Sequence, residues 1–241
     1  MKRTLLLIFA ISAMGADSEQ TEMYLSGEMN SWAATAMAFK DLGTNTWLLT
    51  LQSDGDDGTS EFKFRNSSSN YDQNWSSENS SSVSLGTKDD FWNPNNSTNG
   101  DFSETNTNYY TFTIKDVANS AHSSGFIQET SGSPVSISSV SDNSADGVPN
   151  TSITVSITLS GSKSSEEKIY VRSSTDSFVN DVWNLATGSG TSYSATISTS
   201  GSGTVAYYVL TTTLTSSGTG DLDNYPDLAT LYFDNNSGSN Y

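Results

Sequence analysis

"SITVSITLS", residues 152–160, alternates apolar and polar side chains along its whole length. Successive side chains of an extended chain point to opposite sides. One side of this stretch therefore carries only Ile, Val and Leu, and the other carries only Ser and Thr. This period of two predicts a β-strand with one buried face and one face in water.

Similar short stretches recur along the chain between clusters of Gly, Asn, Asp and Ser, and they predict an all-β protein. The expected strands are residues 22–27, 46–51, 60–66, 109–114, 135–140, 152–160, 168–173, 192–197, 204–210 and 227–233. Helical patterns are nearly absent, and only residues 31–42, "SWAATAMAFKDL", could form a turn of helix.

The strands are expected to form two β-sandwiches in tandem. In "QETSGSPVS", residues 128–136, Gly and Ser precede a Pro, and the alternating pattern restarts after it. We therefore predict a first β-sandwich over residues 17–131 and a second over residues 132–241. About six strands in the second half are typical of an immunoglobulin-like or fibronectin-like sandwich.

The amino terminus has the pattern of a signal peptide. Lys2 and Arg3 precede an apolar run that is too short to span a bilayer, and small residues follow at Gly15 and Ala16. We predict that residues 1–16 are removed and that the protein is secreted, extracellular or at the cell surface. No later stretch is long and apolar enough to predict membrane insertion.

The charge of the chain restricts its partners. The formal net charge is −17, from 27 acidic and 10 basic residues, and such a surface repels nucleic acid and anionic membranes. It is compatible with solubility, with cation binding or with a neutral partner such as a polysaccharide, and equally with a plain solvated surface of a protein from a saline habitat. The chain has no cysteine, so disulfides, thiol catalysis and Cys-ligated zinc are excluded.

A long polar region covers residues 66–106. By composition it could be disordered, but it contains five large aromatic rings, at Tyr71, Trp75, Phe91, Trp92 and Phe102. We expect irregular loops that fold onto the first domain, with the rings either pinning the loops or serving a binding site.

One ordered set of motifs in the first half resembles a known family. "MYLSGEMNSW", residues 23–32, ends a strand in a glycine and places an Asn and a Trp on the following bend; "TWLLTL", "SEFKFRN" and "DQNW" come after it. Over residues 22–115 this order resembles the glycogen- and starch-binding modules, early-set immunoglobulin-like domains of branching and debranching enzymes and of glycan-uptake surface proteins. The matching positions are Gly27, Asn30, Trp32, Trp47, Phe62, Lys63, Phe64 and Trp75.

The resemblance implies that Trp32 and Trp75 form an aromatic platform for glucose rings, while Lys63 and the Asn30 amide contact hydroxyl groups. The chemistry is reasonable, because an indole can cover the apolar face of a sugar and its fixed shape loses little entropy. The family's closing motif is not clear here, and the loop that replaces it carries Trp92, which could extend the platform or cover it.

Structural roles are equally possible for several of these residues. Trp47 opens an alternating strand and is expected in the core. Phe62 and Phe64 should point inward, which leaves Lys63 outward as an ordinary solvated residue. Trp32 and Trp75 could be anchors that hold loops in place.

No catalytic constellation is found, so the protein is not expected to be an enzyme. His122 is the single histidine and would have to support a triad alone. Asp54, Asp56 and Asp57 in "SDGDDGT" could bind Ca²⁺, although Asp-Gly pairs between two strands are also typical of a hairpin turn. A second weak Ca²⁺ candidate contains Asp221, Asp223 and Asp227. No other cofactor is expected.

Two functions remain open. The first is a secreted, non-catalytic protein that binds an α-glucan such as starch or glycogen. The alternative is a structural subunit of an extracellular assembly or filament, linked through sandwich edges. Residues 228–233 alternate like a strand, and after the turn that follows only Tyr241 remains, so we expect an open sheet edge and possible self-association. A fragment of a larger hydrolase is a minor third reading.

Overall fold

The computed structural model describes residues 20–41, 45–55, 58–69, 73–77, 82–92, 98–116, 122–144, 152–199, 204–217 and 220–241. The described chain consists almost entirely of strands that pair antiparallel, which confirms the all-β prediction. The expected signal peptide, residues 1–16, lies outside the described residues. None of the helices in the described part combines the length and the apolar character that crossing a membrane requires.

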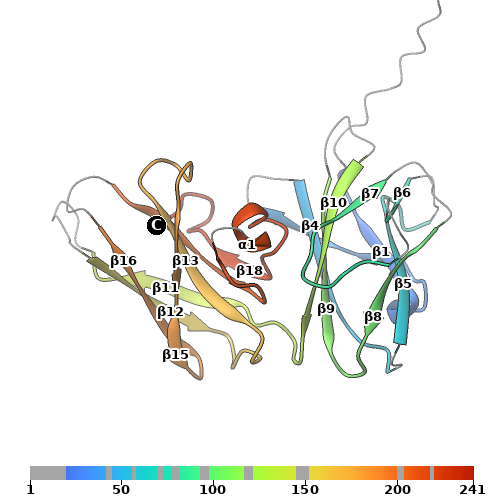
Figure 1. The fold of residues 1–241 in the computed structure, drawn as a ribbon, viewed down its shortest axis with the longest axis horizontal. Helices are drawn as coiled ribbons and strands as arrows, with labels where there is room; N and C mark the ends of the chain where they lie inside the picture. Colours follow the sequence, from blue (N-terminus) through green and yellow to red (C-terminus); the bar gives the residue numbers. More distant parts are fainter. Residues whose placement is uncertain are drawn as a thin grey trace, which may run out of the picture.

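The first half forms one sheet that curls on itself. Its strands are β1 (Tyr24–Gly27), β2 (Thr35–Ala36), β3 (Ala38–Asp41), β4 (Asn45–Gln52), β5 (Gly58–Arg65), β6 (Asn74–Ser77), β7 (Asp89–Trp92), β8 (Gly100–Glu104), β9 (Tyr109–Lys115) and β10 (His122–Thr130). Their order is β2-β1-β5-β6-β7-β10-β9-β4-β3, with β8 beside β5. The two ends of this order, β2 and β3, are separated in sequence by Met37 alone, so the sheet is nearly closed into a barrel (Figure 1).

Aromatic rings fill the interior of this sheet. Phe62 on β5 contacts the rings of Phe64, Phe91, Phe102 and Phe112 at centroid distances between 5.1 and 5.9 Å. Edge-on and tilted ring contacts of this kind add to the stabilisation that burial provides. The core therefore draws on β5, β7, β8 and β9 together.

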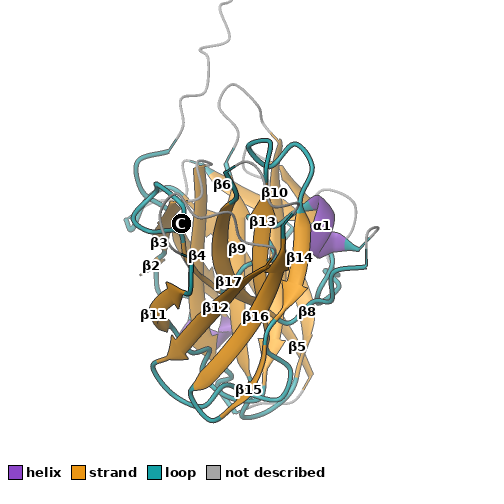
Figure 2. Ribbon diagram, turned by 90° about the vertical axis from the view of Figure 1, so that its left-hand side faces the viewer, coloured by secondary structure: helices purple, strands orange, loops and turns teal. Residues whose placement is uncertain are grey.

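The second half consists of two four-stranded sheets, of order β11-β12-β16-β15 and β14-β13-β17-β18. The strands are β11 (Ile137–Asp142), β12 (Ser152–Leu159), β13 (Lys168–Ser174), β14 (Val182–Leu185), β15 (Thr187–Ser189), β16 (Ser192–Ser198), β17 (Ala206–Thr212) and β18 (Tyr232–Asp234). The apolar side of β12 packs with β16 of its own sheet and with β13 and β17 of the other, so the core lies between the two sheets (Figure 2).

The two halves touch through a third cluster. The segment with α1 (Asp221–Asn224) lies between them in Figure 1, and its Leu222 and Leu228 pack with Phe126 of β10 and Tyr208 of β17. Gln128 Oε1 accepts hydrogen bonds from the Thr212 and Thr213 hydroxyls and from the Thr213 N–H. Within the described residues, no strand pairing crosses residues 131–136. The independence of the two halves stays a prediction.

Several expectations about elements were wrong. Residues 31–41 form no helix, because they supply β2 and β3; a single 3₁₀ turn, η1 (Glu28–Asn30), comes just before them. The region 66–106 is not irregular throughout, since it supplies the short strands β6, β7 and β8 between its loops. The rings of Trp75, Phe91 and Phe102 from this region lie fully inside the core.

The carboxyl end also differs from its prediction. Residues 228–231 are buried but not extended, and β18 begins only at Tyr232. Tyr241 then exchanges two backbone hydrogen bonds of 2.9 and 3.1 Å with Tyr207 on β17, and the two rings stack at 5.2 Å. This edge of β17 is therefore covered by β18 and Tyr241 and is not left open.

Candidate functional site

Trp32 sits on a tight turn that is fixed by one asparagine. The Asn30 oxygen accepts the Gly27 N–H at 2.9 Å, and the Asn30 nitrogen donates to the Leu25 carbonyl at 3.0 Å and to Thr35 Oγ1 at 2.9 Å. The Trp32 N–H also donates to the Gly27 carbonyl at 2.7 Å. The amide of Asn30, expected to contact a ligand, is thus largely used by the turn.

The backbone at Trp32 has an unusual conformation. Ser31 has φ 52° and Trp32 has φ 61°, so two consecutive residues with side chains occupy the left-handed region. A bulky residue there costs on the order of 1–3 kcal/mol. Ser177 and Phe178 form a similar pair, with φ 59° and 63°. The turn keeps the indole only partly buried, where water and ligands reach it.

Close approach of β1 to β5 requires a glycine at the start of this turn. A Cβ on Gly27 would lie 2.5 Å from the Glu61 carbonyl oxygen. The Glu28 carboxylate accepts the Glu61 N–H at 2.8 Å, which ties the 3₁₀ turn to β5. The strand-ending glycine of the sequence motif therefore has a packing role.

Lys63 lies beside the Trp32 turn. It pairs with Ser26 across β1 and β5, and the Ser26 hydroxyl donates to the carbonyl of Ala33, the residue after Trp32. Arg65 Nη1 donates to the same hydroxyl at 3.2 Å. Ser26 and Arg65 are themselves buried, so the accessible groups in this part of β1 and β5 are the Trp32 turn and the half-buried Lys63.

The electrostatics of this face suit a neutral ligand. Lys63 is half-buried, and this loss of hydration lowers its pKa, with the Glu61 carboxylate acting in the opposite direction. Because burial disfavours the charged ammonium, a hydrogen bond that the ammonium donates stabilises its charged form. A hydroxyl-bearing ligand can accept such a bond without bringing a charge to an acidic protein.

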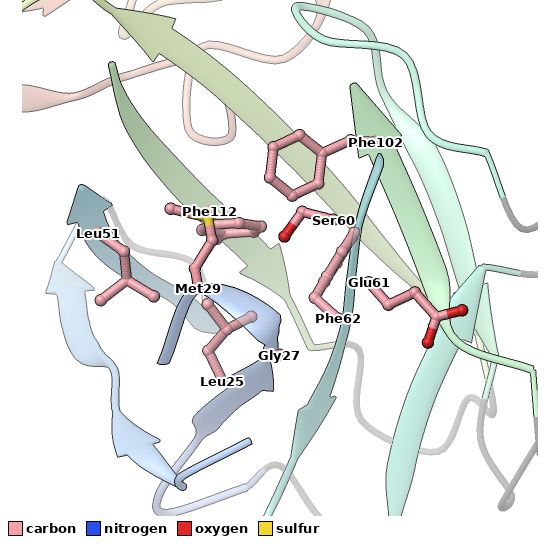
Figure 3. A pocket seen from close by; sticks show the side chains of 9 residues that line it. All are labelled: Leu25, Gly27, Met29, Leu51, Ser60, Glu61, Phe62, Phe102 and Phe112. Carbon is pink, nitrogen blue, oxygen red and sulfur yellow. The ribbon is translucent and has the colours of Figure 1, made fainter. Parts of the chain in front are cut away.

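The space beneath the turn is not a ligand pocket. Met29 and Leu51 close a gap against Phe62, Phe102 and Phe112, and the Ser60 hydroxyl points into it (Figure 3). The gap is too narrow for a water molecule, and the buried Ser60 Oγ has no hydrogen-bond partner. Any ligand of this site would therefore bind on the outer surface.

The two-ring platform is not present. Trp75 is 0% exposed, because β6 pairs with β5 and places its ring opposite Phe64 in the core. The expectation that Trp75 faces a sugar was wrong, and its alternative role as an anchor fits the structure. The backbone of Trp92 belongs to β7, but its side chain lies outside the described residues.

Trp47, Phe62 and Phe64 are buried, as predicted for core residues. Sequence reasoning did not find Ser26 and Arg65 on the face beside Trp32. Ser26 and Arg65 lie on the same side of the sheet as Lys63 because β1 pairs with β5 in the register that places Ser26 opposite Lys63. This register cannot be read from the sequence.

The predicted Ca²⁺ site at Asp54, Asp56 and Asp57 stays a prediction, because the structure describes only one of its three residues. Asp54 is exposed and its N–H donates to Glu104 Oε1 at 3.3 Å, whereas Asp56 and Asp57 lie outside the described residues. The segment is not a hairpin turn either, since β4 and β5 do not pair with each other. Among the described residues, no three His, Cys, Asp or Glu side chains are grouped as metal ligands.

The second acidic stretch has structural roles. Asp223 accepts hydrogen bonds from the Ser216 hydroxyl and from the Ser217 and Gly220 N–H groups. Asp227 forms a salt bridge of 2.7 Å with Lys115, whose charge lowers the Asp227 pKa against the effect of burial. His122 is exposed at the start of β10.

Comparisons with protein families, with curated proteins and with solved structures found no match.

Proposed function

We propose that this chain is a secreted, non-catalytic carbohydrate-binding protein that binds an α-glucan, starch or glycogen, on the outer face of β1 and β5. Trp32 supplies the stacking surface, and Lys63 supplies a hydrogen-bond donor at its side. Trp75 takes no part, because its ring is in the core. The signal-peptide pattern of residues 1–16 supports secretion.

The observation that carries this proposal is the backbone of Trp32. A left-handed tryptophan that is only partly buried is held in place by the three hydrogen bonds of Asn30. A purely structural turn would be more stable with Gly or Asn in such a conformation. Retention of an indole at this cost is accounted for if the ring contacts a ligand.

The chemistry of a glucan fits this face. A pyranose ring presents apolar C–H groups that an indole can cover, and its hydroxyl rim can accept a bond from Lys63. Both partners can form the contact without bringing charges together, which matters in a chain of net charge −17.

We further infer that each half is a variant of the immunoglobulin-like sandwich. In the first half, the Tyr110 hydroxyl accepts the Thr105 N–H at 2.6 Å and donates to Glu129 Oε1 at 2.7 Å. This link from a strand-start tyrosine to backbone upstream resembles the tyrosine corner of such domains. The second half supports the inference by packing two antiparallel sheets around one core.

A structural subunit of an extracellular assembly is the second candidate function. It is favoured by one observation, the exposed apolar side chains at the β14 edge, Val182 and Leu185. An uncovered apolar edge is a template for another chain.

Sedimentation with insoluble polysaccharide tests the proposed function. The mature chain, residues 17–241, is mixed with granular starch, cellulose or chitin, and the fraction in each pellet is measured. We expect depletion by starch that soluble maltooligosaccharide reverses, with little loss to cellulose or chitin. Equal recovery in the supernatant with all three solids would overturn the proposal.

A further inference from the structure

We propose that a second copy of this chain pairs along the side of the second half that β14 and β15 form. This association does not depend on glycan binding at Trp32. It concerns the opposite half of the molecule and different chemistry, namely backbone hydrogen bonds and apolar contact at a sheet edge.

A single segment forms the edges of both sheets on this side. β14 is the last strand beside β13, and β15 is the last strand beside β16. Only Ala186 separates them, and its N–H donates to the Ile169 carbonyl where the chain passes from one sheet to the other. Residues 182–189 therefore present two unpaired strand edges in succession, as Figure 2 shows for β14 and β15.

Apolar side chains are concentrated at this edge. Among the described residues, five large apolar side chains are exposed, and three of them lie at or next to β14. Val179 is 80% exposed, Val182 is 60% exposed and Leu185 is 53% exposed. Natural edge strands are usually protected by charges, prolines, bulges or a very short length. β14 has no charged residue and no proline, and only its length of 4 residues limits pairing.

The sequence around this edge is free of charge. Residues 182–220 contain no Asp, Glu, Lys, Arg or His, although the chain carries 27 acidic residues in all. The nearest acid, Asp181, is paired with the guanidinium of Arg172. The outward positions of β16, which lies next to β15, and of β12 beyond it are all Ser or Thr, so the neighbouring face is neutral as well.

The opposite side of the second half is protected. β11 ends in Asp142 and β18 ends in Asp234, and both carboxylates accept hydrogen bonds, from Tyr207 and Tyr241 respectively. No strand from another chain is therefore needed to cover the sheet edge at the carboxyl end. The open edge lies on the other side of the sandwich.

Charge and symmetry together point to a second copy as the occupant. Two identical strands can pair antiparallel about a two-fold axis, and each then offers the other the same outer strand edge and the same apolar side chains. Like charge opposes approach over most of a surface with net charge −17, and the neutral segment 182–220 removes that repulsion at this edge. Added salt should therefore strengthen the association, because it screens the remaining repulsion.

Light scattering after size-exclusion chromatography tests the proposal on the mature chain over a range of concentrations. We expect a dimer that grows with concentration and with salt. Leu185→Lys puts a charge on the edge and should weaken the dimer at least tenfold. Ser139→Lys, on the exposed face of β11, makes the same charge change at the opposite edge strand and should leave the dimer intact.

Hydrogen exchange separates edge pairing from other contacts. Amides of residues 182–189 should exchange more slowly at high protein concentration in the parent and not in Leu185→Lys. Melting curves confirm that both variants fold. A parent that is monomeric at every concentration, or a dimer that Leu185→Lys and Ser139→Lys affect equally, would overturn the proposal.

Discussion

Asn30 holds the turn that carries Trp32. Both donor positions of its amide are used within the turn, by the Leu25 carbonyl and by Thr35, and its oxygen holds the Gly27 N–H. The left-handed backbone of Trp32 depends on this network, because nothing in the intrinsic preference of tryptophan favours that conformation. Asn30 is therefore a positioning residue for the proposed site.

Removal of this side chain should affect both stability and binding. We expect Asn30→Ala to lower the free energy of unfolding by about 1–3 kcal/mol, because buried backbone groups at Gly27 and Leu25 lose their partner. Urea denaturation measures this change. Asn224→Ala, at an exposed position, is the control and should stay within about 0.5 kcal/mol. An unchanged free energy of unfolding in Asn30→Ala would show that other contacts hold the turn.

Residue roles were the least predictable part of the site. Trp32 and Trp75 occur in equally polar sequence, yet one is partly exposed and the other lies in the core. The difference arises because Trp75 enters a strand that pairs with β5, a long-range contact that local composition does not encode. Buried Trp47, Phe62 and Phe64 were predictable, because Phe62 and Phe64 alternate with polar residues and Trp47 opens an apolar strand.

At the scale of elements, β7 and β10 fit together through a glycine. Gly125 on β10 lies beneath the ring of Phe91 on β7, and a Cβ at this position would come 2.2 Å from Phe91 Cε2. The ring cannot withdraw easily, because Phe64 and Phe62 pack against it at centroid distances of 5.2 and 5.9 Å. The glycine thus lets an aromatic ring lie flat on the sheet.

Gly125→Ala should therefore destabilise the barrel-like sheet. We expect a loss of about 1–3 kcal/mol from overpacking, measured by urea denaturation. The double variant with Phe91→Leu should recover part of this loss, because the smaller side chain frees space for the methyl group. Gly132→Ala, whose Cβ would meet nothing closer than 3.9 Å, is the matched control. Equal effects of the two single variants would contradict this description of the packing.

The same elements show where sequence reasoning ends. β4, β5, β9, β12, β13, β16 and β17 were predicted because their apolar side chains alternate or run together. β10 was missed although it is a central strand, because its first residues, His122 to Gly125, read as a polar loop. Strands β6, β7 and β8 were missed because each is short and lies within an Asn- and Ser-rich region.

At the scale of the whole molecule, one buried lysine joins the two halves. Lys40 on β3 donates to the backbone carbonyls of Asp227 and of Thr230, the latter at 2.7 Å, and is almost fully buried between the halves. Lys115 and the Asp227 carboxylate are the charged groups beside it. Burial lowers the pKa of Lys40 to about 7, against the effect of Asp227.

This shift predicts how stability depends on pH. Between pH 7 and 9 the unfolded chain keeps a proton on Lys40 that the folded chain has lost, so the free energy of unfolding should rise with pH. The slope from one proton is at most about 1.4 kcal/mol per pH unit. Tyr110 does not interfere, because its pKa is raised to about 12.

Urea denaturation at pH 7, 8 and 9 measures this slope in the parent and in Lys40→Met. The variant keeps the apolar stem and removes the titrating group, so the rise should disappear. Lys163→Met, at a surface position of the second half, should keep it. The same slope in the parent and in Lys40→Met would mean that another group titrates.

Starch retention of Trp32→Ala tests the central claim most directly. Trp183→Ala, which removes a partly buried indole from β14, is the control, and melting curves confirm that both variants are folded. Loss of the stacking ring should cost roughly 1–3 kcal/mol of binding, about tenfold in affinity for each 1.4 kcal/mol. The account predicts that Trp32→Ala stays in the supernatant while Trp183→Ala pellets with starch like the parent. Undiminished retention of a folded Trp32→Ala chain would contradict it.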